Sequence, residues 1–103
     1  MVHEVQNVDT LNNDENVLVD FYSTTCGPCK TLLPVLEEIS EEFSEQLKVA
    51  KVEVSNNCQA VQKFGVMSVP TIMFMQKSRV KEVQRGFSNK ASIRSMIQKH
   101  MKP

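Results

Sequence analysis

Tryptophan is absent from this chain of 103 residues, and tyrosine occurs only once. Basic and acidic side chains number 12 each, so the net charge is zero and no basic field attracts nucleic acid or an anionic membrane. No apolar run approaches the roughly 18 residues that a membrane-spanning helix needs. The N-terminal segment also lacks the apolar stretch of a signal peptide, which predicts a cytoplasmic protein.

Cysteine is also scarce, with three residues at positions 26, 29 and 58. One close pair and one odd cysteine do not form the disulfide framework of a small secreted protein. The length predicts a single domain, residues 1–103, that is able to bury a core without covalent staples.

Hydrophobic patterning predicts alternating strands and helices in the order βαβαβαββα, and hence an α/β fold. The first half requires parallel strands with crossover helices, and the second half adds an antiparallel edge. The strands are expected over 2–8, 17–22, 47–54, 70–75 and 80–85. The helices are expected over 26–43, over 58–64 and from 88 or 89 onward, with a short helix capped at 9 or 10 and ended by 12–14.

The segment Val17–Lys30 combines a buried strand, a short polar loop and two cysteines at the start of a helix. The first turn of a helix presents unpaired N–H groups and the positive end of the macrodipole, which favour a thiolate at Cys26. Cys29 follows one helical turn later, so its sulfur returns beside that of Cys26. This arrangement predicts a nucleophile, Cys26, and a resolving thiol, Cys29, that together carry two electrons.

The motif Cys26-Gly27-Pro28-Cys29-Lys30 follows a Val-Asp-Phe strand and precedes a Val-Pro-Thr segment. In these features the chain resembles the thioredoxin family over nearly its whole length. The resemblance implies a central mixed five-stranded sheet flanked by four helices. It also implies a monomeric protein-disulfide reductase whose only redox group is its own disulfide. Its partners would be disulfide-containing target proteins and a reductase fed by NADPH through a flavin.

Asp20 interrupts the apolar run of the strand that leads to the cysteines. A carboxyl group buried below Cys29 would have a raised pKa, and it could accept and return the proton of that thiol. The resemblance supports this role, since the family carries a buried Asp at the matching position. Lys51 shares a strand face with Val49, which predicts partial burial. The matching lysine of the family lies near the buried Asp, so the resemblance implies that Lys51 tunes Asp20, although a lysine with a buried stem and an exposed end fits equally well.

The resemblance implies further substrate-binding positions around the cysteine motif: Thr25, Gly27, Pro28, Val69, Pro70 and Gly86. The matching proline of the family is cis and faces the two cysteines, so the Val69 backbone is expected to pair with a substrate strand. Gly86 would allow a partner backbone to approach closely. Thr25 stands where the family usually has Trp, so we expect a more exposed Cys26 and a different range of partners.

Three alternatives stay open at this stage. A zinc half-site would need two further ligands, for which Cys58, His3 and His100 are the candidates. An oxidase or isomerase of the same fold is disfavoured by the Gly-Pro dipeptide between the cysteines. A binding subunit, or a redox protein dedicated to one partner, would use the same groove and tolerate the missing Trp. Cys58 is interpreted as an idle or buried thiol, with a regulatory thiol as the alternative.

Overall fold

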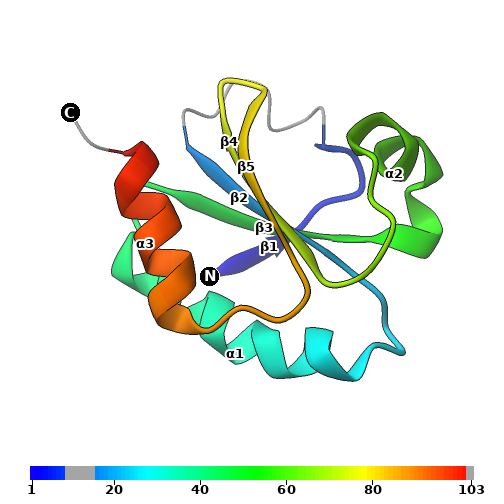
Figure 1. The fold of residues 1–103 in the computed structure, drawn as a ribbon, viewed down its shortest axis with the longest axis horizontal. Coiled ribbons are helices and arrows are strands. Elements are labelled where there is room, and N and C mark those ends of the chain that lie inside the picture. The colour runs from blue at the N-terminus through cyan, green and yellow to red at the C-terminus, as the bar shows by residue number, and fades with distance from the viewer. Residues whose placement is uncertain (9–15, 102–103) are drawn as a thin grey trace.

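The computed structural model describes residues 1–8 and 16–101, which form a central five-stranded sheet covered by helices on both faces (Figure 1). The strands are β1 (Val2–Glu4), β2 (Val17–Tyr22), β3 (Lys48–Glu53), β4 (Thr71–Gln76) and β5 (Arg79–Arg85). The helices are α1 (Gly27–Glu42), α2 (Cys58–Phe64) and α3 (Lys90–His100), with a 3₁₀ turn η2 (Val54–Asn56) before α2.

The sheet has the order β1-β3-β2-β4-β5. β1, β3 and β2 are parallel, β4 is antiparallel to β2, and β5 is antiparallel to β4. This confirms the expected α/β fold with a parallel half and an antiparallel edge. β2 lies at the centre of the sheet, because its apolar residues face helices on both sides.

Two apolar cores lie on the two faces of the sheet. The first joins α1 and α3 to residues of β2, β3 and β4, and it includes Leu18, Leu36 and Ile93. The second lies under α2 and includes Val19, Phe21 and Met73. Successive residues of β2 therefore alternate between the two cores, and Asp20 lies on the face that α1 and α3 cover.

Some expected boundaries differ from the observed ones. The first strand was expected over 2–8 but ends at Glu4, so that prediction is wrong beyond this residue. Four flanking helices were expected, whereas the described residues form three α-helices. The additional helix was expected over residues 9–14, which lie outside the described part of the chain.

Helix and turn ends follow local backbone chemistry. Gly65 ends α2 in the left-handed conformation, with φ 65°, as its position predicts. Asn89 caps α3 by accepting a hydrogen bond from the Ser92 N–H at 2.8 Å. The turn between β4 and β5 places Lys77 and Ser78 at positive φ, 49° and 72°, without a glycine.

Candidate active site

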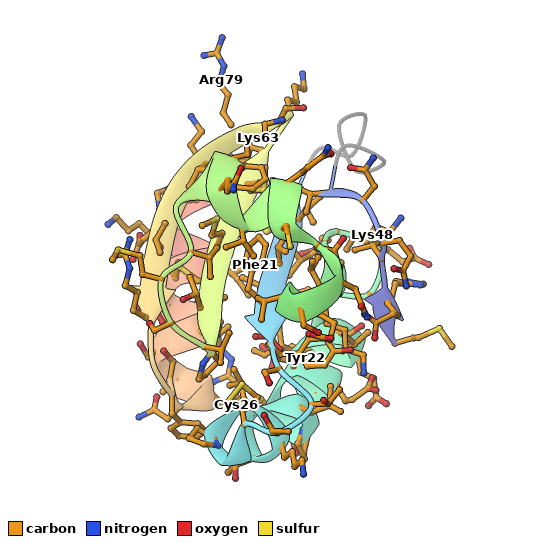
Figure 2. All side chains as sticks on the ribbon, turned by 90° about the vertical axis from the view of Figure 1, so that its right-hand side faces the viewer. Phe21, Tyr22, Cys26, Lys48, Lys63 and Arg79 are labelled. Carbon is orange, nitrogen blue, oxygen red and sulfur yellow. A yellow bond between two sulfur atoms is a disulfide. The ribbon has the colours of Figure 1, made fainter. Side chains whose placement is uncertain are left out.

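The two cysteines of the redox pair lie at the start of α1, just after the loop that follows β2. Figure 2 shows the path of the chain from Phe21, which lies under α2, through Tyr22 to Cys26 at one end of the molecule. Cys26 is the N-cap residue of α1, with φ −88° and ψ 114°, and its N–H donates to the Ser23 carbonyl at 3.2 Å. Cys26 and Cys29 form a disulfide with a Cα–Cα distance of 5.3 Å, as the spacing predicted.

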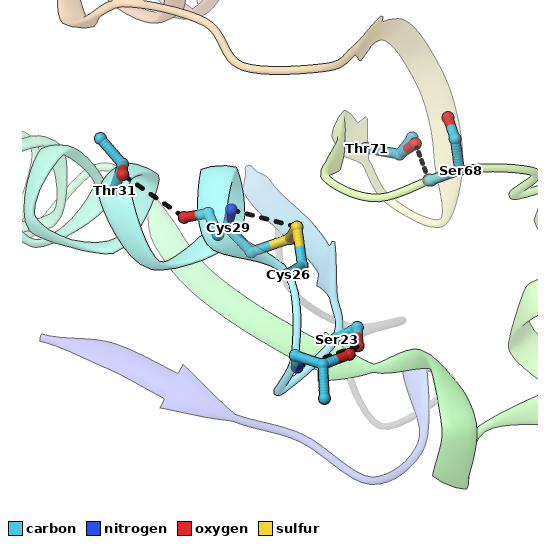
Figure 3. The surroundings of a disulfide bond; sticks show 8 residues. Ser23, Cys26, Cys29, Thr31, Ser68 and Thr71 are labelled. Carbon is cyan, nitrogen blue, oxygen red and sulfur yellow. Dashed lines mark hydrogen bonds between the residues drawn. A yellow bond between two sulfur atoms is a disulfide. The ribbon is translucent and has the colours of Figure 1, made fainter.

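The two sulfur atoms have different surroundings (Figure 3). Cys26 is partly exposed, whereas Cys29 is buried with 4 % of its surface accessible. The backbone N–H of Cys29 donates to the Cys26 sulfur at 3.2 Å, and α1 has no acidic residue in its first turn. When the disulfide is reduced, this N–H and the helix dipole stabilise a thiolate at Cys26. An accessible sulfur beside a shielded one suits sequential attack and resolution.

A second segment, which carries Ser68 and Thr71, belongs to the surroundings of the disulfide drawn in Figure 3. The Val69–Pro70 peptide bond is cis, as expected, and Val69 is partly exposed. Thr71 donates its hydroxyl to the Ser68 carbonyl at 2.7 Å, and the Gly86 N–H donates to the Pro70 carbonyl at 2.8 Å. The first bond closes the segment on itself, and the second ties it to the end of β5, where Gly86 has φ 83°.

Asp20 is buried, with 2 % of its surface accessible. Burial raises the pKa of its carboxyl group to about 7, while Lys51 lowers it and Glu4 raises it further. Its Oδ1 atom has no hydrogen-bond partner among the described residues. The expectation of a buried carboxyl with a raised pKa is therefore confirmed, and Asp20 can gain or lose a proton near neutral pH.

A cavity of about 280 Å³ is lined by both Asp20 and Cys29. Its lining combines the ends of β2 and β3 with the first turns of α1: Asp20, Tyr22, Ser23, Thr24, Cys29, Lys30, Leu33 and Lys51. Because Asp20 and Cys29 line the same cavity, water within it could carry a proton between the carboxyl and the thiol. A larger hollow of about 790 Å³ lies elsewhere, near Met1 and Leu47, and none of the expected site residues lines it.

The structure also brings to this site a residue that the sequence analysis missed. Glu4 of β1 is paired in register with Lys51 of β3, which is paired in turn with Asp20 of β2. Lys51 is partly buried, as expected, and its ammonium group lies 3.7 Å from the Glu4 carboxylate. The sequence placed Glu4 only on the same face of a short strand as Val2, and this does not identify the residue beside it on the next strand.

Within residues 1–8 and 16–101, no group of three or more His, Cys, Asp or Glu side chains lies close enough together to hold a metal ion. Cys58 is an exposed free thiol at the start of α2, so the interpretation as a buried thiol is wrong, while an idle or a regulatory thiol stays a prediction. None of the described helices has the length and apolar character to cross a bilayer.

Comparison with known proteins gives one consistent match. The model of the Thioredoxin family matches residues 2–99. Thioredoxin of Bacillus subtilis is 40% identical over 85 residues, 82% of each chain, and that of Rickettsia typhi is 36% identical over 103 residues, 96% of this chain and 98% of its own. The solved structure of a single-residue mutant of thioredoxin from Halobacterium salinarum superposes with a TM-score of 0.90 at 28% identity, covering 99% of this chain and 92% of its own.

Proposed function

This chain belongs to the thioredoxin family and is a thiol–disulfide reductase, and from that premise we propose how its own residues perform the exchange. One observation carries the proposal: a partly exposed Cys26 at the N-cap of α1 is bonded to a buried Cys29. The disulfide is itself the redox group, and we propose no further cofactor.

In the reduced protein, the Cys26 thiolate attacks one sulfur of a target disulfide. A mixed disulfide forms, and the second target sulfur leaves as a thiolate that takes up a proton. The Cys29 thiolate then attacks the Cys26 sulfur and breaks the mixed disulfide. The target sulfur that was bonded to Cys26 leaves as a thiolate and takes up a proton, and the Cys26–Cys29 disulfide closes. Two electrons pass from the dithiol to the target, which ends with two thiols.

Resolution requires that the buried Cys29 thiol lose its proton. Asp20 is the proposed acceptor, because it lines the same cavity and its pKa lies at about 7. In the return reaction, in which a reductase opens the disulfide, the same carboxyl group returns the proton. Lys51 is proposed to tune this transfer, since its ammonium lowers the pKa of Asp20.

The target polypeptide is proposed to lie across the partly exposed sulfur of Cys26. The backbone of Val69 would pair with an extended target segment, with Pro70 and Gly86 shaping that side of the groove. Thr25, Gly27 and Pro28, all exposed, would contact the target on the other side. Membership of the family implies disulfide-containing target proteins and a thioredoxin reductase as partners. We propose a reductase that uses NADPH and a flavin, and a single-domain, cytoplasmic monomer that binds neither nucleic acid nor membrane.

The test is reduction of insulin disulfides driven by dithiothreitol, comparing the wild type with Cys26→Ser and Cys29→Ser. We expect the wild type to accelerate the reaction well above the reagent alone and both variants to lose the acceleration. A Cys58→Ser variant is the control, and it should keep full activity because Cys58 lies outside the site. Equal rates for the wild type and both active-site variants would contradict general reductase activity.

A second candidate is a redox protein restricted to one dedicated partner, or a binding subunit that uses the same groove. The exposed Thr25 favours it, because this position offers little apolar surface to a target. A binding role should survive the loss of both thiols, so pull-down of a partner by the Cys26→Ser/Cys29→Ser variant would separate it from redox turnover.

A further inference from the structure

Lys51 lies between two carboxyl groups on one face of the sheet. Its neighbours in register are Glu4 on β1 and Asp20 on β2, and directly paired residues of adjacent strands point to the same face. The single ammonium group of Lys51 can therefore approach either carboxyl group. The distance of this ammonium group from Asp20 decides how far it lowers the pKa of the Asp20 carboxyl group.

The ammonium lies with Glu4. Lys51 Nζ is 3.7 Å from Glu4 Oε1, and within the described residues Lys51 forms no ion pair with Asp20 at 4 Å or less. The Oδ1 atom of Asp20 remains without a hydrogen-bond partner in that part of the chain, although it is buried. An opposite charge was thus available to a buried carboxyl group but is held by a more exposed one.

Tyr22 fixes this arrangement. Its hydroxyl group donates to Glu4 Oε1 at 2.6 Å, and its ring lies under Lys51 Nζ at 5.2 Å from the ring centroid. The short hydrogen bond holds the Glu4 carboxylate in place, and the ring face attracts the ammonium. Burial and the hydrogen bond to Glu4 both raise the pKa of Tyr22, so its hydroxyl keeps its proton and continues to donate.

We propose that Glu4 is a positioning residue that withholds the Lys51 ammonium from Asp20, and that Tyr22 holds Glu4 in position to do so. The inference rests on the proposed role of Asp20 as proton acceptor. A residue of β1, at the edge of the sheet, would then control the proton transfer between Asp20 and Cys29.

The physical consequence concerns the strength of Asp20 as a base. An opposite charge within about 4 to 6 Å lowers the pKa of a carboxyl group by about 1 to 3. An ammonium moved onto Asp20 would therefore leave a carboxylate that no longer takes a proton from Cys29 near neutral pH. The cavity of about 280 Å³ is lined by both Asp20 and Lys51, so it has room for that movement.

Few other charged or titratable groups face Asp20. α1 presents Cys29 and Lys30 to the same cavity, while β4 presents the apolar Ile72 as the partner of Asp20 in register. Glu53 of β3 is paired with Tyr22, and its carboxylate accepts hydrogen bonds from Ser55. The variants below leave all of these groups unchanged, so a change at Asp20 reports on Glu4, Tyr22 and Lys51.

The test follows the Asp20 carboxyl carbon by NMR as a function of pH in the oxidised protein. We expect Glu4→Gln to lower the midpoint of the Asp20 titration by about one pH unit, because the freed ammonium moves to Asp20. Tyr22→Phe keeps the ring and removes the hydrogen bond, and it should shift the midpoint in the same direction by less. Glu38→Gln, which breaks an exposed ion pair of 3.5 Å with Lys90, is the matched control and should leave the midpoint unchanged.

A second background separates this mechanism from simple repulsion between Glu4 and Asp20. In Lys51→Met no ammonium can move, so Glu4→Gln should shift the Asp20 midpoint by much less than it does in the wild type. An equal shift in both backgrounds, or an unchanged or raised midpoint in Glu4→Gln alone, would overturn the inference. Insulin reduction by the same wild-type sample tests the reductase function separately, since the titration reads Asp20 whether or not the protein turns over.

Discussion

Cys29 donates its backbone N–H to the sulfur of Cys26 at 3.2 Å, within the first turn of α1. The contact joins the buried member of the pair to the accessible one, so each cysteine has a distinct environment before any target binds. In the reduced protein the same N–H favours negative charge on Cys26 and not on Cys29. This asymmetry leads to the first prediction.

The two single cysteine variants should differ in their ability to trap a target. In a Cys58→Ser background, which removes the exposed third thiol, Cys29→Ser should accumulate a mixed disulfide through Cys26. Cys26→Ser should accumulate at least about tenfold less, because the remaining thiol is buried. Mass spectrometry after incubation with an oxidised target under non-reducing conditions measures both. Comparable trapping through Cys29 would show that the assignment of nucleophile and resolving thiol is wrong.

The buried carboxyl group of Asp20 should make stability depend on pH. Its pKa is raised from 3.8 to about 7, so between these values the unfolded chain releases a proton that the folded protein keeps. The free energy of unfolding therefore falls as pH rises through this window, by up to about 4 kcal/mol, and levels off above it. Asp20→Asn has no carboxyl group to ionise, so its free energy of unfolding should exceed that of the wild type by a few kcal/mol at pH 8.

Urea unfolding of the oxidised wild type and Asp20→Asn at pH 4 and pH 8 measures the effect. The difference between the two proteins should shrink towards pH 4, where the carboxyl group is protonated in the folded protein and about half protonated in the unfolded chain. A difference that stays the same at both pH values would mean that Asn alters packing and that the charge of Asp20 is not the cause.

The turn between β4 and β5 should tolerate a stabilising substitution. Lys77 has φ 49°, a left-handed conformation in which an ordinary side chain costs about 1 to 2 kcal/mol. Asn adopts this conformation more readily and favours two-residue hairpin turns, so Lys77→Asn should raise the free energy of unfolding by about 0.5 to 1 kcal/mol. Gly65→Ala, at φ 65°, is the opposite case and should lower it by about 1 kcal/mol. Thermal unfolding of both variants checks the prediction, and a loss of stability in Lys77→Asn would contradict it.

We expect Thr25 to limit the range of targets that bind and to have little effect on the redox chemistry itself. It is exposed beside Cys26, and its N–H donates to the Ser23 hydroxyl at 3.2 Å. Thr25→Trp adds a large apolar ring at the edge of the groove, and a well-placed aromatic contact contributes about 1 to 2 kcal/mol to binding. We therefore expect kcat/KM for insulin to rise about tenfold, chiefly through a lower KM. Glu41→Trp, at an exposed position near the C-terminal end of α1, is the control, and an equal gain there would indicate non-specific adhesion.

Local chemistry explains why much of the active site could be predicted. The N-cap position of Cys26, the return of Cys29 after one turn and the start of α1 depend on residues within a few positions of one another. The raised pKa of Asp20 was also predictable, since apolar residues occupy both faces of this strand and an Asp within it is therefore buried on either face. The cis bond before Pro70 came from the family resemblance and not from local preference.

Other features depended on contacts between distant segments. β1 ends at Glu4 because only three of its residues pair with β3, and the apolar pattern from residue 2 to 8 does not reveal this. The exposure of Cys58 depends on how α2 packs on the sheet, which its short sequence does not specify.

The sequence by itself determined the order of the described strands and helices, the redox pair and the family, because these follow from hydrophobic periodicity and from short motifs. Only the tertiary structure decided that Glu4, Lys51 and Asp20 form one row across three strands. These residues are far apart in the chain, and the register that aligns them is set when the apolar faces of the sheet pack against α1 and α3. A shift of β3 by one residue would turn Lys51 to the opposite face of the sheet and remove the choice between the two carboxyl groups.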